Sequence, residues 1–249
     1  MELFAAETGV GDIPVVLLHG FGGSHSVWTE IRDLIGVARR VIAFDLPGHG
    51  GSLAHPHGSA AQAARAVLEA LEQRGVARAH WVGHSMGGAA AAVAALATPE
   101  RTASLTLLAP GGFGREVNHR LLRRYAAATE EGRAGAAPGA ILRLGFHRAG
   151  GVRAARARER KAPGAPAALM RIVETFFEGY RQKTLATADL ARLNAPVKVL
   201  WGTQDRVLPT RQAHKLPGKI AVHIFEHAGH MLPQEIPREA ADLILENTR

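Results

Sequence analysis

The feature that most constrains this chain is a serine between two glycines, Gly83-x-Ser85-x-Gly87, which follows a short apolar run and precedes an alanine-rich stretch. This order predicts a strand, a sharp turn and a helix. The glycines leave room for the tight backbone, and the turn places the Ser85 hydroxyl at the positive end of the helix. A hydroxyl is a poor nucleophile without a base and an anion-stabilising pocket, so a reactive Ser85 requires both elsewhere in the chain.

Apolar runs typical of buried strands alternate with helical stretches along most of the 249 residues. Continuous apolar strands of this kind indicate a parallel sheet covered on both faces, so we predict an α/β fold. The predicted strands are 14–18, 41–44, 80–82, 105–109, 197–201 and 222–225. The predicted helices are 26–35, 60–74, 86–98, 211–215 and 238–246, with Ser59 as the N-cap of the second.

The alternation breaks between Pro110 and Asn194, where glycines and prolines punctuate short helical stretches and no strand is evident. A connection of this length is far longer than an ordinary loop. The sequence therefore predicts a core formed by residues 1–110 and 194–249, with residues 111–193 inserted as a helical cap.

The positive charge of the chain is concentrated in this cap. Residues 111–185 hold 15 Lys and Arg against 6 Asp and Glu, whereas the remaining residues hold 15 and 16. The surplus indicates either attraction for an anionic substrate or acidic partner, or a solvated helical surface. The cap arginines Arg123, Arg124, Arg143 and Arg171 are candidates for holding an anion. No nucleic-acid partner is expected, because no binding motif or series of aromatic residues accompanies the charge.

Composition excludes several other classes of protein. The absence of cysteine excludes disulfides, thiolate catalysis and cysteine-based metal sites. The N-terminus lacks the basic start and apolar run of a signal peptide, and the longest run of small and apolar residues, 87–97, is too short to span a bilayer. We therefore expect a cytoplasmic protein without a membrane partner, and leave a homo-oligomer open.

Two residues near the C-terminus can supply the base and its orienting carboxylate. His230 lies in a glycine-containing loop after the last predicted strand, and Asp205 follows the preceding strand. Functional groups of an open parallel sheet gather at the carboxyl ends of its strands, as Ser85 also does. His223 and His227 lie closer to the strand and are interpreted as structural or exposed. The order Ser85, Asp205, His230 is the one found in α/β-hydrolases.

The anion-stabilising donors should be backbone N–H groups. One is that of Met86, directly after Ser85, and the other lies in the glycine-rich stretch after the first long strand, where we assign Phe21, with Gly22 as the alternative. That stretch lacks the Gly-Lys-Ser/Thr ending of a phosphate loop and the glycine spacing of a dinucleotide site. The candidate substrate-binding residues beside these groups are Gly20, Gly22, His84 and Met231.

Five stretches in this order resemble the α/β-hydrolase superfamily of the serine hydrolase type. They are 17–24, 44–52, the Ser85 elbow, the Asp205 loop and the His230 loop. The resemblance covers nearly the whole chain. It implies an α/β-hydrolase fold with a mostly parallel eight-stranded sheet, flanking helices, a lid after the sixth strand and an antiparallel edge to which residues 3–6 contribute. It also implies that Asp45 fixes its loop, and Ser85 in place of Asp excludes the dehalogenase and epoxide hydrolase types.

The resemblance implies acyl transfer through an acyl-enzyme, with no metal or organic cofactor. His55 and His57 could suggest a metal pair, but the sequence offers no third ligand, so we interpret them as loop residues. The expected partner is a small acyl substrate, which is anionic if the cap arginines face the pocket.

Two groups within the superfamily are similar in detail. Carbon–carbon bond hydrolases share the 85–88 elbow and a helical cap, but usually carry an aromatic residue where this chain has Met231. The catalytic portion of acetoin dehydrogenase acyltransferase subunits is similar at 109–118 and 229–235. We expect a carboxylic ester or thioester hydrolase. Cleavage of an activated carbon–carbon bond, acyl transfer to another acceptor and a non-catalytic ligand-binding role are the alternatives.

Overall fold

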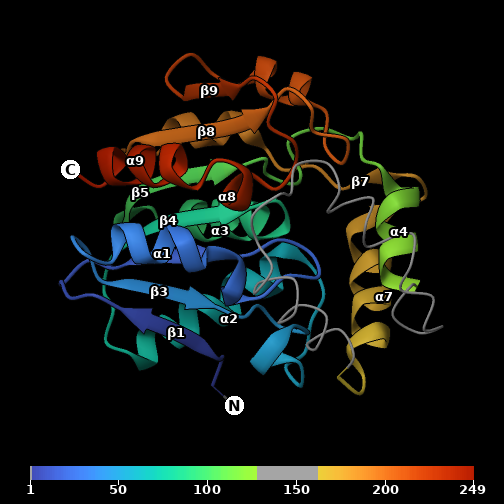
Figure 1. Ribbon diagram of the computed structural model, residues 1–249, viewed down its shortest axis with the longest axis horizontal. Helices are drawn as coiled ribbons and strands as arrows, with labels where there is room; N and C mark the ends of the chain where they lie inside the picture. Colours follow the sequence, from blue (N-terminus) through green and yellow to red (C-terminus); the bar gives the residue numbers. More distant parts are fainter. Residues whose placement is uncertain (1, 128–161) are drawn as a thin grey trace.

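A mostly parallel sheet of seven strands organises the protein in the order β1-β3-β2-β4-β5-β8-β9 (Figure 1). The computed structural model describes residues 2–127 and 162–249. Only β1 runs antiparallel to its neighbour, β3. The strands are β1 Ala5–Thr8, β2 Val15–Leu18, β3 Val41–Phe44, β4 Ala79–His84, β5 Thr102–Leu108, β8 Val197–Gly202 and β9 Ala221–Phe225.

Helices cover both faces of the sheet, as its apolar strands require. In Figure 1, α1 and α9 lie on one face and α2 and α3 on the other, and each pair is in contact. Every residue of β2, β3, β4 and β8 is buried, which explains why these strands are apolar without alternation. The helices of the core are η1 His25–Trp28, α1 Thr29–Ile35, η2 Gly50–Ser52, α2 Ala60–Gln73, α3 Met86–Ala97, η3 Pro99–Arg101, η5 Thr210–Lys215, α8 Leu232–Glu235 and α9 Pro237–Asn247.

The six predicted strands are confirmed, with ends displaced by at most three residues. Ser59 caps α2 as predicted: its side chain accepts from Gln62 N, and the Gln62 side chain accepts from Ser59 N. The predicted helix at 26–35 is a 3₁₀ turn followed by α1, and that at 211–215 is the 3₁₀ helix η5. The described sheet has seven strands where the resemblance implied eight, and its antiparallel edge is the single strand β1.

The described parts of the predicted cap lie beside the carboxyl ends of the parallel strands (Figure 1). They contain α4 His119–Ala127, α7 Ala165–Phe176, and the 3₁₀ helix η4 Thr187–Arg192, which precedes β8. A short antiparallel hairpin, β6 Phe177–Glu178 and β7 Arg181–Gln182, corrects the prediction that this stretch has no strand. Residues 128–161, including Arg143, lie outside the described residues, so the division into core and cap stays a prediction.

Helices α4 and α7 pack on each other through a small apolar cluster of Tyr125, Ala126, Leu169 and Val173, separate from the main core. The Tyr125 hydroxyl also donates to the carbonyl of Gly22, 3.1 Å away, which ties α4 to the glycine-rich loop after β2. No helix in the described ranges combines the length and apolarity needed to cross a bilayer.

Candidate active site

Ser85 occupies a turn that a non-glycine residue rarely adopts, with φ 54° and ψ −117°, between β4 and α3. Neighbouring strands hold it there. Ser85 N donates to the carbonyl of Leu108 at 3.0 Å, and Gly111 N donates to the carbonyl of Ser85 at 2.8 Å. A strained backbone of this kind persists only where the surrounding structure determines it, and it is common at functional sites.

The two glycines of the motif are required by close backbone contacts. A Cβ at Gly83 would lie 2.4 Å from the carbonyl oxygen of Gly87. A Cβ at Gly87 would lie 2.3 Å from the carbonyl oxygen of Leu18 and 2.4 Å from that of His19. Any side chain at either position would therefore push α3 away from β2 and β4.

Ser85, His230 and Asp205 form a continuous chain of hydrogen bonds. His230 Nε2 lies 3.0 Å from Ser85 Oγ, and His230 Nδ1 lies 2.8 Å from Asp205 Oδ2. Because a carboxylate only accepts, Nδ1 carries the proton, and Nε2 is left to accept from the Ser85 hydroxyl. The three residues follow β4, β9 and β8, so the sheet brings together groups that are 25 to 145 positions apart.

Asp205 is held by four donors. Its Oδ1 accepts from the backbone N–H groups of Val207 and Leu208, both at 2.8 Å. Its Oδ2 accepts from Trp201 Nε1 at 3.2 Å and from His230. The Asp205 side chain is fully buried. These contacts leave the carboxylate a single orientation, directed at the imidazole.

His84, predicted to bind substrate, instead contacts the backbone of the His230 loop. Its Nε2 lies 2.8 Å from the carbonyl oxygen of His230, so this nitrogen donates. The two rings lie 4.9 Å apart. His84 is buried at the end of β4, and its hydrogen bond restrains the backbone of His230.

The loop after β2 packs directly on the elbow. A Cβ at Gly20 would lie 3.0 Å from Ser85 Cβ and 2.8 Å from His84 Nδ1, so only glycine fits. His19 holds the loop from behind: its Nδ1 donates to the carbonyl of Gly20 at 2.8 Å, and its Nε2 accepts from Leu46 N at 2.9 Å.

The structure separates the two candidate donors of this loop. Gly22 N donates to His49 Nε2 at 3.1 Å, so it is already engaged. Within the described residues, no group accepts from the N–H of Phe21. Met86 N belongs to the first turn of α3, where N–H groups have no partner inside the helix. Of the three N–H groups that the sequence indicated, those of Phe21 and Met86 are therefore left without an acceptor among the described residues, whereas that of Gly22 is engaged.

His49 must be neutral to accept from Gly22. Its Nδ1 donates to the carbonyl of Pro47 at 3.1 Å, which leaves Nε2 as the acceptor. Burial and the neighbouring His19 lower the pKa of His49 to about 3. In the same loop, Asp45 accepts from His25 N at 2.6 Å and from Gly51 N at 2.8 Å, a structural arrangement like the one predicted for it.

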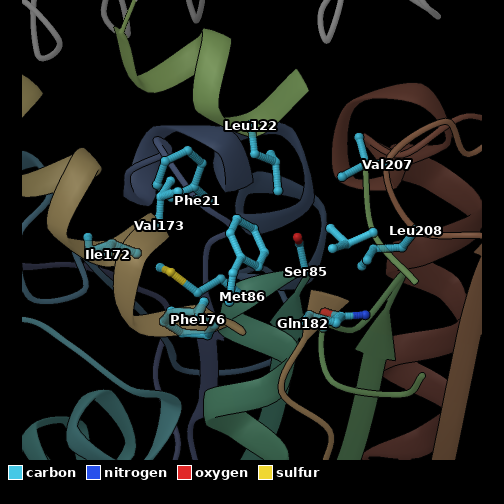
Figure 2. Close-up of a pocket in the computed structure, with 13 residues that line it drawn as sticks. Phe21, Ser85, Met86, Leu122, Ile172, Val173, Phe176, Gln182, Val207 and Leu208 are labelled. Atoms are coloured by element: carbon cyan, nitrogen blue, oxygen red, sulfur yellow. The ribbon is translucent and has the colours of Figure 1, made fainter. Parts of the chain in front are cut away.

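A pocket opens directly above the Ser85 hydroxyl, between the elbow and helices α4 and α7 (Figure 2). The empty space between its walls is about 440 Å³, part of which is open to solvent. Its wall is almost entirely apolar, and none of the described lining residues carries a charge. The apolar side chains labelled around the pocket in Figure 2 include Leu122, Ile172, Val173, Phe176, Val207 and Leu208.

The remaining predicted substrate contacts lie outside this lining. Phe21 and Met86 line the pocket, but Gly20, Gly22, His84 and Met231 do not. Gly20 packs against Ser85, and His84 is hydrogen-bonded to the backbone of the His230 loop. The pocket wall comes mainly from the cap segment, which no short motif of the sequence marks, and from Val207 and Leu208 in the Asp205 loop after β8.

Among the described residues of the cap, no arginine lines the pocket. Arg123 and Arg124 are exposed on α4, and Arg171 is exposed on α7, where its Nε lies 3.2 Å from His57 Nε2. His55 and His57 are loop residues, and no cluster of three metal-ligating side chains forms within residues 2–127 and 162–249. The charge surplus of the cap is therefore, in its described part, a property of the outer surface.

Sequence reasoning missed two polar residues near the site. Gln182 on β7 lines the pocket, and its Oε1 accepts from Gly112 N at 3.0 Å. Glu235 on α8 accepts from the backbone of the His230 loop. Gln182 belongs to no local motif, and Glu235 is the last residue of the stretch 229–235 but carries no signal of its contacts there, which only the fold shows.

Comparison with known proteins agrees with this geometry. The family model described as "alpha/beta hydrolase fold" matches residues 13–235. The acetyltransferase component of the acetoin cleaving system of Pseudomonas putida is 33% identical over 95% of this chain and 64% of its own length. The chain thus spans less than two thirds of that relative.

Two solved structures superimpose closely. An esterase from Thermogutta terrifontis has a TM-score of 0.77 at 26% identity, covering 98% of this chain and 92% of its own. A meta-cleavage product hydrolase from Pseudomonas fluorescens has a TM-score of 0.79 at 21% identity, covering 98% and 93%, a likeness that shows the fold alone. The family match, the sheet and the elbow together show that this chain belongs to the α/β-hydrolase fold family.

Proposed function

We propose that this protein is a serine hydrolase that cleaves carboxylic esters or thioesters of apolar acyl groups through an acyl-enzyme. The observation that carries the proposal is the unbroken hydrogen-bond chain from Asp205 through His230 to Ser85, which ends beneath an apolar pocket. A nucleophile, a base and an orienting carboxylate in this geometry are the parts that acyl transfer requires.

In the first step, the Ser85 hydroxyl would add to the substrate carbonyl while His230 Nε2 takes its proton. Asp205, held by backbone donors, stabilises the imidazolium that forms. The carbonyl–leaving group bond then breaks, and His230 returns the proton to the departing oxygen or sulfur. In the second step, water attacks the acyl-enzyme with His230 again as base, which releases the acid and restores Ser85.

The oxyanion of each tetrahedral intermediate would accept from the N–H groups of Phe21 and Met86. Neither group has an acceptor among the described residues, whereas the alternative donor, Gly22 N, is occupied by His49. Loss of one such donor typically costs about 3–4 kcal/mol of transition-state stabilisation.

The pocket supports an apolar acyl group. Aliphatic and aromatic side chains from α4, α7 and the loop after β8 surround the space above Ser85, and no described lining side chain could pair with a substrate carboxylate. A charged group buried there would lose its hydration without compensation.

The test is covalent labelling of Ser85. We expect a fluorophosphonate to label the wild-type protein and to inactivate its hydrolysis of short p-nitrophenyl esters, whereas Ser85→Ala folds, is not labelled and shows no turnover above background. Labelling of Ser85→Ala at the wild-type rate would overturn the assignment. A folded wild-type protein that is never labelled would favour a ligand-binding role.

A second candidate function is acyl transfer to an acceptor other than water. It is favoured by the similarity to the acetoin-system acetyltransferase component, which extends over 95% of this chain. The two functions differ in how the acyl-enzyme partitions. Addition of a small thiol to a thioester assay should leave the acid as the main product for a hydrolase, and should yield the new thioester for a transferase. Activated carbon–carbon bond cleavage would appear as turnover of a vinylogous diketone.

A further inference from the structure

Glu235 brackets the loop that carries His230. Its Oε2 accepts from Gly229 N at 2.5 Å, and its Oε1 accepts from Met231 N at 2.8 Å. These two N–H groups belong to the residues on either side of His230. The carboxylate sits at the end of α8, just after the loop, so one side chain holds the backbone before and after the imidazole.

We propose that Glu235 is a positioning residue that fixes His230 for proton transfer, an inference that rests on the proposed function. Together with His84, which donates to the carbonyl of His230, it restrains the loop at three successive residues. The imidazole must reach Ser85 at 3.0 Å and Asp205 at 2.8 Å at once, so a small rotation of its backbone breaks one contact.

The arrangement needs the ionised carboxylate. A carboxylate can accept with both oxygens, whereas a protonated carboxyl or an amide presents a hydrogen to one of the two backbone N–H groups. Burial raises the pKa of Glu235, and Asp205 adds to this, although the two N–H donors and His230 act in the opposite direction. The two backbone N–H donors therefore offset part of the cost of burying the charged carboxylate.

The charged groups that act on Glu235 are His230 and Asp205. Helix α8 also packs against η1 and α9. The titratable side chain of η1 is His25, which is bound to Asp45, and the exposed ones of α9 are Arg238, Glu239, Asp242 and Glu246. The described neighbours thus give Glu235 no cationic partner other than a protonated His230.

The test compares Glu235→Gln with the wild-type chain and with Glu239→Gln, a matched charge removal at an exposed position of α9. For Glu235→Gln we expect kcat for a p-nitrophenyl ester to fall about 10- to 100-fold, with KM unchanged within twofold. Fluorophosphonate labelling of Ser85 should slow by a similar factor. The melting temperature at pH 8 should change little, because the loss of one hydrogen bond is offset in part by removal of the cost of burying the charge.

A second variant and a second readout separate positioning from folding. Glu235→Asp keeps the charge but is one methylene shorter and cannot reach both N–H groups, so it should share the loss of kcat. Amide hydrogen exchange at Gly229 and Met231 should accelerate in both Glu235 variants and not in Glu239→Gln.

Wild-type kcat in Glu235→Gln, or a loss of kcat that only follows a loss of folded protein, would overturn the inference. Full activity in Glu235→Asp would do the same. Failure of the proposed function would give a different result. In that case the fluorophosphonate would label Ser85→Ala, or it would not label the wild-type protein.

Discussion

The floor and the wall of the pocket are built by different physical means. The floor, at the carboxyl ends of β4, β8 and β9, is a network of directional hydrogen bonds in which Ser85, His230 and Asp205 each have defined partners. The wall, from α4, α7 and the loop after β8, consists mainly of apolar side chains. Hydrogen bonds fix atoms to within a few tenths of an ångström, whereas apolar contacts tolerate changes of shape. If the proposed function holds, the floor sets the chemistry and the wall selects the acyl group.

The largest effect should come from the floor. Asp205→Asn preserves the shape of the side chain but can donate to His230 Nδ1, which would favour the tautomer that cannot accept from Ser85. We expect kcat to fall by about 10⁴, with little change in KM. Steady-state kinetics of ester hydrolysis measures this. A loss smaller than tenfold would mean that the hydrogen bond between His230 and Asp205 does not orient the base.

The next effect concerns His49, which accepts from Gly22 N and so holds the loop that carries Phe21. The pKa of His49 is lowered to about 3, below the ordinary histidine value of about 6.5. Between these values the unfolded chain binds a proton that the folded chain does not. His49 should therefore lower the free energy of unfolding by about 1.4 kcal/mol per pH unit as the pH falls from about 6.5 toward 3.

Glutamine at position 49 can still accept from Gly22 N but does not titrate. Urea unfolding at pH 8 and pH 5 should show a difference that is about 2 kcal/mol smaller for His49→Gln than for the wild type. His80, whose pKa is lowered to about 4 mainly by burial, is retained in both proteins and serves as the internal reference. An equal pH dependence of the two proteins would contradict a buried neutral His49.

The smallest effect should come from the wall, and it should change selectivity instead of chemistry. Val173→Phe places a larger side chain in the pocket between α7 and the elbow and so reduces the space for substrate. The kcat/KM for longer acyl chains should therefore fall by the equivalent of about 1–3 kcal/mol, while acetyl esters keep their rate. A chain-length series of p-nitrophenyl esters measures this. Arg123→Ala, on the exposed face of α4, is the matched cap control and should leave the whole series unchanged within twofold. An equal loss for all chain lengths would show that the wall also positions the floor.

The two regions also differ in how far the sequence predicted them. Periodicity located six strands, and four of them, β2, β3, β4 and β8, are buried at every residue, which makes them continuous apolar runs. It missed the hairpin of β6 and β7, since two-residue strands have no period to detect. It also did not reveal the roles of Gln182 and Glu235, because the contacts of these side chains depend on how the chain folds.

The sequence by itself determined which groups stand at the carboxyl ends of the strands and in what order, because burial and turn chemistry are local properties of the chain. Only the tertiary structure decided that Gly22 N is occupied by His49 while Phe21 N is not, since those partners are 27 residues apart. It likewise decided that the described pocket wall is apolar although the cap is rich in arginine. The physical reason is that which side of a helix faces the site depends on how the helix packs, and composition does not record packing.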